Sequence, residues 1–465
     1  MSVSNFSQDL LRYLRINGPT FSGELTAHFG ISRATLSRRV QELGDGIASI
    51  GKGRATQLAA KHEELRSEVP IYQVQENGQL WLFGRLHALQ GGGQVYWHLE
   101  TEKAQSALLQ DEFKNGIFPG WPWFLEDLRP AGFLGRAFAR NVSGQLGISG
   151  DLNQWTDFEL LKILTTYGFN LQGNFLLGNG QALDDYQSHV VRVREGLKDK
   201  YTLENYPDLA EWALDGDEKF GSSAGGEQPK FTIRLTEQSP DEFRAVIVKF
   251  SPKLDTEVGR RWADLLHAEQ IANQILSEAG FAAAQTRVFE QENRAYLESE
   301  RFDRVGTLGR RGLVSLRALD AAYVGMGSGS WADVAHRLYA GKWVTLEDRD
   351  RMIRLHCFGE LIANSDMHWG NLSFFLPEAS PFPLAPVYDM LPMHFRPSGS
   401  GEIVEREFKP RLPKPEDLDA WLEMYPYAIA FWRKVADSTS ISDSFKVIAI
   451  AAIEALHRIH HIAVH

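Results

Sequence analysis

Two carboxylates and an amide in the later part of the chain have the types and spacing needed for phosphoryl transfer. Asp366 and Asn371 lie in a segment expected to form the loop between a helix and a strand. At this spacing an aspartate can accept the proton of a substrate hydroxyl while the asparagine binds Mg²⁺. Residues 384–390 are expected to form an apolar strand with Asp389 at its end, where a second acid is suited to hold the metal. We therefore expect Asp366 to be a catalytic base, and Asn371 and Asp389 to be metal ligands.

A glycine-containing loop and a lysine lie upstream of these residues, and both suit a nucleotide phosphate. The loop contains Gly225 and Gly226, where backbone N–H groups can approach phosphate oxygens without hindrance from a Cβ atom. It leads into a predicted β-hairpin over 231–250. Strand alternation places Lys249 on one face with small and apolar side chains. The lysine is thus expected to bind phosphate beside an adenine pocket.

Regular elements must bring the loop, the lysine and the downstream residues together. Apolar residues at helical spacing predict one helix over about 257–279 and another over about 349–363. Two strands are expected within 285–299. Glu269 lies in the first helix, and the sequence leaves open whether it pairs with Lys249. The phosphate- and metal-binding candidates all fall at junctions between these elements, and this order favours a nucleotide-dependent phosphotransferase.

Four motifs together resemble the HipA-type Ser/Thr kinases, which are toxins of bacterial toxin–antitoxin systems. The motifs are Ser222-Ser-Ala-Gly-Gly226, Glu300-Arg-Phe-Asp-Arg304, Asp366-Met-His-Trp-Gly-Asn371 and Pro386-Val-Tyr-Asp389. The resemblance covers about residues 75–465. It implies an α+β, two-lobed protein-kinase-like fold with a mixed N-lobe and a mainly helical C-lobe.

The same resemblance implies cofactors, partners and further site residues. ATP and Mg²⁺ are the implied cofactors, with adenine held by the backbone from Glu300 to Phe302. A serine of the glycine loop is implied to be autophosphorylated, and Ser222 is the closer match by position, with Ser223 the alternative. The implied acceptor is a serine or threonine of another protein, an aminoacyl-tRNA synthetase or another translation factor.

The first sixty residues predict three helices and a short hairpin, in the order of a winged helix-turn-helix. On the third helix Ala34, Val40 and Leu43 are expected to face inward. This segment holds seven Lys or Arg residues against four Asp or Glu, although the whole chain carries a net charge of −11. DNA affinity is therefore expected here. The candidate DNA contacts are Arg33, Thr35, Ser37, Arg38, Arg39, Lys52 and Arg54.

The chain of 465 residues is long enough for about two to four domains. We expect a winged helix-turn-helix over 1–60, a linker over 61–75, an N-lobe with the glycine loop and lysine over 76–300, and a C-lobe over 301–465. The single cysteine excludes an intramolecular disulfide. The sequence begins without a signal-peptide pattern, and no segment approaches the roughly 20 apolar residues of a membrane span. A cytoplasmic protein with no membrane partner is the expectation.

Two other functions remain open at this stage. The chain could be a DNA-binding transcriptional regulator whose kinase-like part senses a nucleotide or another ligand without transferring phosphate. It could also be a small-molecule kinase, because such enzymes share the Asp…Asn loop. His368, inside that loop, is expected to brace it. The helical spacing of His457 and His461 also fits a metal site, but cations at a helix C-terminus are favoured without one.

Overall fold

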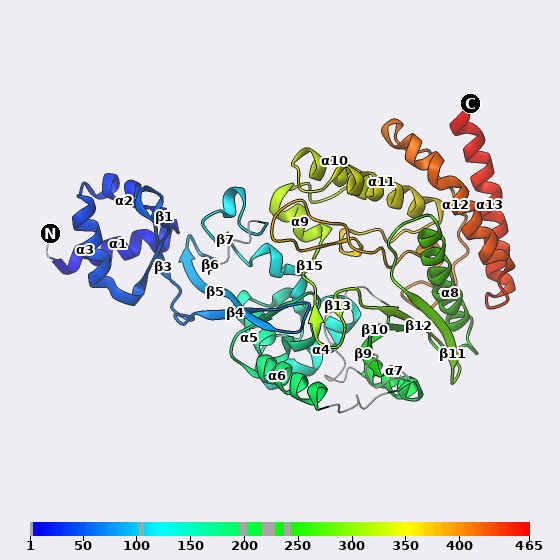
Figure 1. Ribbon diagram of the computed structural model, residues 1–465, viewed down its shortest axis with the longest axis horizontal. Helices are drawn as coiled ribbons and strands as arrows, with labels where there is room; N and C mark the ends of the chain where they lie inside the picture. Colours follow the sequence, from blue (N-terminus) through cyan, green and yellow to red (C-terminus); the bar gives the residue numbers. More distant parts are fainter. Residues whose placement is uncertain (1–2, 102–106, 196–201, 216–227, 237–242) are drawn as a thin grey trace.

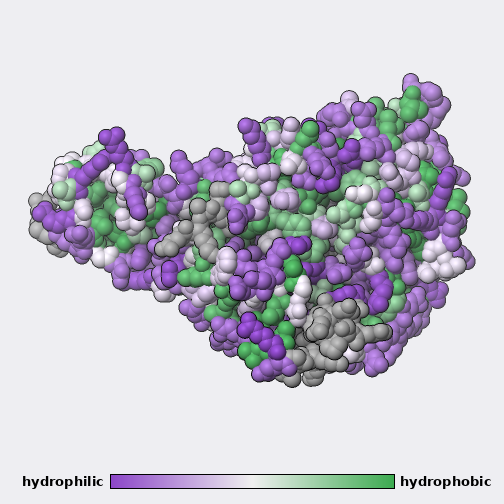
Figure 2. Space-filling model, viewed as in Figure 1, coloured by the Kyte–Doolittle hydropathy of each residue, from purple (hydrophilic) through white to green (hydrophobic). Residues whose placement is uncertain are grey.

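The computed structural model describes residues 3–101, 107–195, 202–215, 228–236 and 243–465. Its helices and strands form a mixed α+β fold with two main sheets. Figure 1 shows the two chain ends at opposite ends of the long axis, with the first three helices set apart from the rest. In Figure 2 this N-terminal part is joined to the larger body by a narrower waist.

The N-terminal unit, residues 3–61, packs three helices against a small hairpin. Its core is formed by Leu10, Leu14, Leu25 and Leu36 with apolar residues of the strands. Gly30 has a φ of 62° in the turn between the second and third helices, a conformation that favours glycine. The elements are α1 (Val3–Asn17), β1 (Thr20–Phe21), α2 (Ser22–Phe29), α3 (Arg33–Leu43), β2 (Ile47–Ile50) and β3 (Gln57–Lys61).

A single eight-stranded sheet runs from this unit into the middle of the chain. Strand β3 pairs with β5, and the order continues as β1-β3-β5-β4-β8, with β2 on β3 and β6 between β5 and β7. The strands are β4 (Val69–Val74), β5 (Leu80–Gly91), β6 (Gln94–Glu100), β7 (Ile117–Pro119) and β8 (Phe175–Leu177). The accompanying helices are α4 (Gly132–Leu146), α5 (Asp157–Tyr167), α6 (Gln181–Arg194) and α7 (Tyr206–Asp215).

The seam between β3 and β5 is closely packed. Ile50, Ala59 and Leu89 form a small core across it. A Cβ atom on Gly91 would lie 2.1 Å from the Cα of Gly18, so only glycine fits there. Main-chain pairing and tight packing therefore join the N-terminal unit to the middle sheet.

A four-stranded antiparallel sheet, in the order β11-β12-β10-β9, lies between two helices. One face packs on α7, through Tyr206 and Leu209. The other packs on α8, through Leu266 against Leu297. The elements are β9 (Lys230–Thr236), β10 (Phe243–Phe250), α8 (Glu257–Glu278), β11 (Thr286–Gln291) and β12 (Arg294–Glu300), so the predicted hairpin, helix and strand pair are confirmed.

The remaining third is mainly helical and shares one large core with the middle of the chain. Two short strand pairs, β13 with β14 and β15 with β16, complete it. The elements are β13 (Arg304–Val305), β14 (Gly309–Arg310), β15 (Leu313–Ser315), α9 (Leu316–Tyr323), α10 (Trp331–Ala340), α11 (Leu346–Leu361), β16 (Ser373–Phe375), α12 (Leu418–Asp437) and α13 (Asp443–Val464).

Two local expectations differ from the structure. On α3, Leu36 is the buried residue and Ala34 is exposed, because the leucine is the residue that faces the core formed by α1 and α2. Within 61–75, where a linker was expected, residues 69–74 form β4, which pairs with β5 and β8. Alternation of apolar residues along β4 buries one face of it, despite the polar residues just before it.

Helix α13 differs from the expectation that no segment of the chain approaches the length and apolar composition of a membrane span. It is one described helix that is long and apolar enough to cross a membrane, by length and composition alone, with a mean hydropathy of 1.5. Its uninterrupted apolar runs are short, but only Glu454 and Arg458 carry charge between Val447 and Val464. The helix packs on α12, and Phe445 and Leu456 are fully buried in the core.

Candidate active site

Lys249 on β10 is the centre of a buried ion-pair cluster. Its Nζ lies 2.7 Å from both Oε1 and Oε2 of Glu269 on α8, and it also donates to Oδ1 of Asp389. Lys249 and Glu269 are 5% and 1% exposed. The pairing with Glu269, which the sequence left open, is thus present. Lys249 and Asp389 are 140 residues apart in the sequence, and the fold brings the Asp389 carboxylate to the Lys249 ammonium group.

The loop that follows α11 positions Asp366 and Asn371. Nδ2 of Asn371 donates to the carbonyl oxygen of Asp366 at 2.9 Å. The backbone N–H of Asp366 donates to Oδ1 of Asn364 at 3.0 Å. Nδ1 of His368 accepts from the N–H of Gly370 at 3.0 Å, so the histidine braces the loop as expected. These side-chain bonds add to a short 3-10 turn over Trp369–Asn371 and to backbone bonds such as Asn371 N–H to the His368 carbonyl at 3.0 Å.

Asp389 lies beside this loop in an unusual backbone conformation. Its φ is 57°, in the left-handed region that few non-glycine residues adopt. Its carbonyl oxygen accepts from Nδ2 of Asn364 at 3.4 Å. The neighbouring Tyr388 hydroxyl donates to the carbonyl oxygen of Gly370 at 2.8 Å. The Asp389 segment and the Asp366 loop therefore support each other, and strained backbone of this kind is frequent at functional sites.

Burial and charge act on these groups in opposite directions. Burial tends to raise the pKa of Asp389, but the ammonium groups of Lys249 and Lys230 outweigh it and hold that pKa below its usual range. For Asp366, burial dominates and raises its pKa, although His368 and Arg396 oppose the change. Asp389 is thus ionised at neutral pH, and Asp366 binds protons more readily than an ordinary aspartate.

The donor set fits a magnesium ion. Nδ2 of Asn371 is committed to a carbonyl, which leaves its Oδ1 as a ligand atom, and Asp389 has a second carboxylate oxygen beyond the one that Lys249 contacts. Mg²⁺ prefers such oxygen ligands and retains several waters. Lys249, Glu269 and Asp389 together carry one net negative charge, which a divalent cation would offset. The predicted metal ligands are therefore chemically suited to their role.

The segment from Glu300 to Phe302 continues from the end of β12. The N–H of Arg301 donates to the carbonyl oxygen of Ala245 on β10 at 2.8 Å. The half-buried Phe302 ring lies 5.8 Å from the Tyr388 ring and 6.1 Å from the Phe375 ring. This aromatic contact connects the expected adenine-binding segment to the residue before Asp389.

Some predicted site residues lie outside the described residues. They are Ser222, Ser223, Gly225 and Gly226. Just after them, Lys230 at the start of β9 is 3% exposed and acts electrostatically on Asp389 and Glu269. The loop therefore leads directly into a second buried lysine next to Lys249.

Sequence reasoning missed three contributors to the site. Lys230 ends the glycine loop and gives no sign of burial in a single sequence. Asn364, two residues before Asp366, forms bonds to both the Asp366 loop and the Asp389 segment. Asp303 accepts from Arg301 and Arg304 at 2.9 and 2.7 Å, and these bonds fix the segment after Phe302. The alternation of charges in Arg301 to Arg304 was the one available signal.

The predicted DNA-contact residues occupy the exposed side of α3 and the hairpin tip, with one exception. Arg33, Ser37 and Arg38 are exposed, as are Lys52 and Arg54, and Thr35 is half-buried with its N–H bonded to Ser32. Arg39 instead donates to Glu42 at 2.8 Å and lies 6.0 Å from the Phe6 ring centroid. Its side chain is only 14% exposed. Arg39 therefore stabilises the helix interface.

Comparisons with known proteins agree with these motifs. Residues 65–186 match the middle domain of YjjJ-like toxins, and residues 222–451 match the HipA-like C-terminal domain. The toxin YjjJ of Escherichia coli strain K12 is 37% identical over 451 residues, which cover 96% of this chain and 97% of that protein. The chain belongs to the HipA-like toxin family. Within it, this chain is similar to the YjjJ-like members along almost its whole length.

Solved structures resemble it more distantly. HipA of Shewanella oneidensis MR-1, solved with HipB and operator DNA, is 16% identical with a TM-score of 0.48 and covers 84% of this chain and 97% of its own. The Helicobacter pylori proinflammatory kinase CtkA is 15% identical with a TM-score of 0.34, covering 53% and 95%. Both scores lie below 0.5.

Proposed function

We propose that this HipA-like toxin is a Ser/Thr protein kinase that transfers the γ-phosphoryl group of ATP to a protein hydroxyl. The observation that carries the proposal is the convergence of Lys249, Glu269 and Asp389 in one buried cluster beside the Asp366–Asn371 loop. Phosphoryl transfer relies on positioning and charge stabilisation rather than covalent chemistry. A cytoplasmic location suits an enzyme that uses ATP.

Each residue of the cluster has a defined task in this proposal. Lys249, held by Glu269, neutralises charge on the phosphates. Asp366 accepts the proton of the acceptor hydroxyl, and its raised pKa makes it a better base than an exposed aspartate. Asn371 and Asp389 would hold Mg²⁺, which when bound supplies positive charge against the phosphate oxygens. The segment from Glu300 to Phe302 would receive adenine, and Gly225 and Gly226 the phosphates.

The test uses purified full-length protein with radiolabelled ATP and Mg²⁺. We expect self-labelling that maps to Ser222 or Ser223, and loss of about 10²-fold or more in labelling rate for Asp366→Asn, because the base is removed. Asp437→Asn, an exposed aspartate at the end of α12, is the matched control and should label normally. Full labelling by Asp366→Asn would contradict the proposed base.

The same assay separates the competing functions. Transfer only to an added metabolite would indicate a small-molecule kinase. ATP binding without transfer to any acceptor would indicate a regulator that senses nucleotide. For the protein acceptor, the family resemblance suggests an aminoacyl-tRNA synthetase or another translation factor, which a comparison of phosphorylated proteins with and without the active enzyme would identify.

We also propose that the N-terminal unit binds DNA. Exposed cationic side chains on α3 and at the hairpin tip, in a chain of net charge −11, support this proposal. An α-helix fits the major groove, and arginine can donate two hydrogen bonds to guanine there. The unit resembles a winged helix-turn-helix in the order of its elements.

A further inference from the structure

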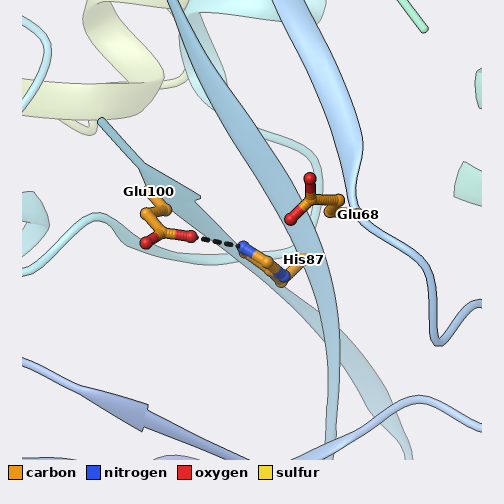
Figure 3. Close-up of side chains that lie close together, drawn as sticks. All are labelled: Glu68, His87 and Glu100. Atoms are coloured by element: carbon orange, nitrogen blue, oxygen red, sulfur yellow. Dashed lines mark hydrogen bonds and ion pairs between the residues drawn. The ribbon is translucent and has the colours of Figure 1, made fainter. Parts of the chain in front are cut away.

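Three side chains of metal-ligating types meet on the middle sheet, and none of them belongs to the candidate active site. Glu68 precedes β4, His87 lies on β5 and Glu100 ends β6. Their ligand atoms all lie within 4.8 Å of one another, and Nε2 of His87 is 3.0 Å from Oε2 of Glu100. Figure 3 shows the His87 ring between the two carboxylates. The group is formed by three separate segments of the chain.

The sheet fixes the imidazole in place. His87 and His98 are direct partners across β5 and β6, and their rings stack at 5.7 Å with an interplanar angle of 25°. The His87 side chain is only 15% exposed. The imidazole thus presents Nε2 to the carboxylates from a rigid base.

We propose that Glu68, His87 and Glu100 bind a Zn²⁺ ion. Imidazole and carboxylates are zinc ligands at about 2.0–2.2 Å, which places tetrahedral ligand atoms about 3.3 Å apart. The His87–Glu100 distance of 3.0 Å is that of a hydrogen bond, so the two ligand atoms would have to separate slightly to admit the ion. Glu68 and Glu100 have exposed side chains that can rotate by the remaining distance. Two carboxylates and a neutral imidazole balance the charge of Zn²⁺, with water in the fourth position.

Arg85 competes with the ion for one ligand. Its Nε lies 2.7 Å from Oε1 of Glu68, so zinc would take Oε2 or displace the guanidinium. A single surface ion pair of this kind contributes little, whereas ligation of zinc by three side chains is a much stronger interaction. Arg85 therefore lowers the zinc affinity without preventing binding.

The position of the site gives the ion a structural role. Residues 62–68 connect the N-terminal unit to the body, and the N–H of His62 donates to the carbonyl oxygen of Ala88 on β5 at 2.9 Å. Zinc on Glu68 would fasten the other end of this connection to β5 and β6. The site is thus independent of the proposed kinase and DNA-binding functions.

The test measures zinc binding to metal-free, full-length protein by calorimetry and elemental analysis. We expect one Zn²⁺ per chain, an increase in Tm when zinc is added, and no comparable response to Mg²⁺. His87→Ala and the charge-removing Glu100→Gln should each weaken binding at least tenfold and abolish the Tm increase. Arg85→Gln should strengthen binding, since it releases Glu68.

His461→Ala, on the exposed face of α13, is the matched control for histidine loss and should bind zinc like the unaltered protein. The absence of stoichiometric zinc binding would overturn the proposal. So would unchanged affinity in both His87→Ala and Glu100→Gln, or loss of the ion in His461→Ala, which would place it on the C-terminal histidines.

Discussion

A single ammonium group is shared by two carboxylates at the centre of this molecule. Lys249 contacts both oxygens of Glu269 and one oxygen of Asp389. If Glu269 is removed, Asp389 is the partner that Lys249 keeps among the described residues, and this carboxylate is the one proposed to hold metal. The glutamate thus keeps the lysine from occupying the metal ligand completely.

Glu269→Gln should consequently lower both activity and stability. We expect kcat/KM for ATP to fall by about 10²-fold, because the lysine is misplaced. The free energy of unfolding should decrease by up to about 3 kcal/mol, because a buried ion pair is broken. Kinase assays and urea denaturation measure the two effects. Glu278→Gln on the same helix breaks only an exposed pair with Lys434 and should change stability by about 1 kcal/mol at most.

The ionisation of Asp366 predicts the pH dependence of the reaction. A base must be deprotonated, and burial raises the pKa of Asp366 above the ordinary value of 3.8. The acid limb of a kcat/KM profile should therefore lie at higher pH than that value, with activity rising as pH increases through it. His368→Gln should move the limb to still higher pH, because His368 opposes the rise. A limb that does not move would show that His368 acts only on loop shape.

At the scale of elements, the two adjacent arginines of α3 lie in different surroundings, and we expect them to have different roles. Arg38 is exposed, whereas Arg39 pairs with Glu42 and lies near the Phe6 ring. Arg38→Ala should weaken operator binding and reduce the slope of log K against log salt by about 0.9, as for one lost phosphate contact. Arg39→Ala should instead lower Tm and leave that slope nearly unchanged. Fluorescence anisotropy at several salt concentrations, with thermal denaturation, distinguishes the two.

Local patterns predicted the hairpin β9–β10, helix α8, the pair β11–β12 and helix α11, with limits that differ by only a few residues. The apolar strand expected over 384–390 is not formed, because Leu384 and Val387 make only isolated bridges. The hairpin β9–β10 and helix α8 have regular periodicity and polar turns at their ends, so their limits follow from the residues themselves. The inward side of α3 was assigned wrongly at Ala34, although the larger and more apolar Leu36 forms an i, i+4, i+7 stripe with Val40 and Leu43. A short amphipathic helix in one sequence does not reveal its neighbours.

Contacts between distant segments were the part that the sequence could not supply. The spacing of Asp366, Asn371 and Asp389 suggested a shared site, because each lies at a junction of predictable elements. The role of Asn364 depends on the fold of two separate loops, and the pairing of β3 with β5 depends on strand register. Neither leaves a periodic signal in the sequence.

At the scale of the whole molecule, the seam between β3 and β5 joins the N-terminal unit to the middle sheet, and we expect it to make the two parts unfold together. Gly91→Val would place a side chain against Gly18, where a Cβ atom alone would lie 2.1 Å from its Cα. We expect faster proteolysis within 62–68 and a separate, earlier unfolding of the N-terminal unit. Gly23→Ala, with nothing within 4 Å of the added Cβ, is the control and should behave like the unaltered protein. One cooperative transition in Gly91→Val would show that the seam does not hold the unit.

The proposed DNA-binding unit and the proposed kinase belong to one chain. The N-terminal unit, which we propose binds DNA, is joined through the pairing of β3 with β5 to the sheet that supports the proposed kinase. The two units are therefore present in equal numbers at any expression level of the protein. If both proposals hold, the proposed kinase is released from DNA only by a change in the DNA contact itself.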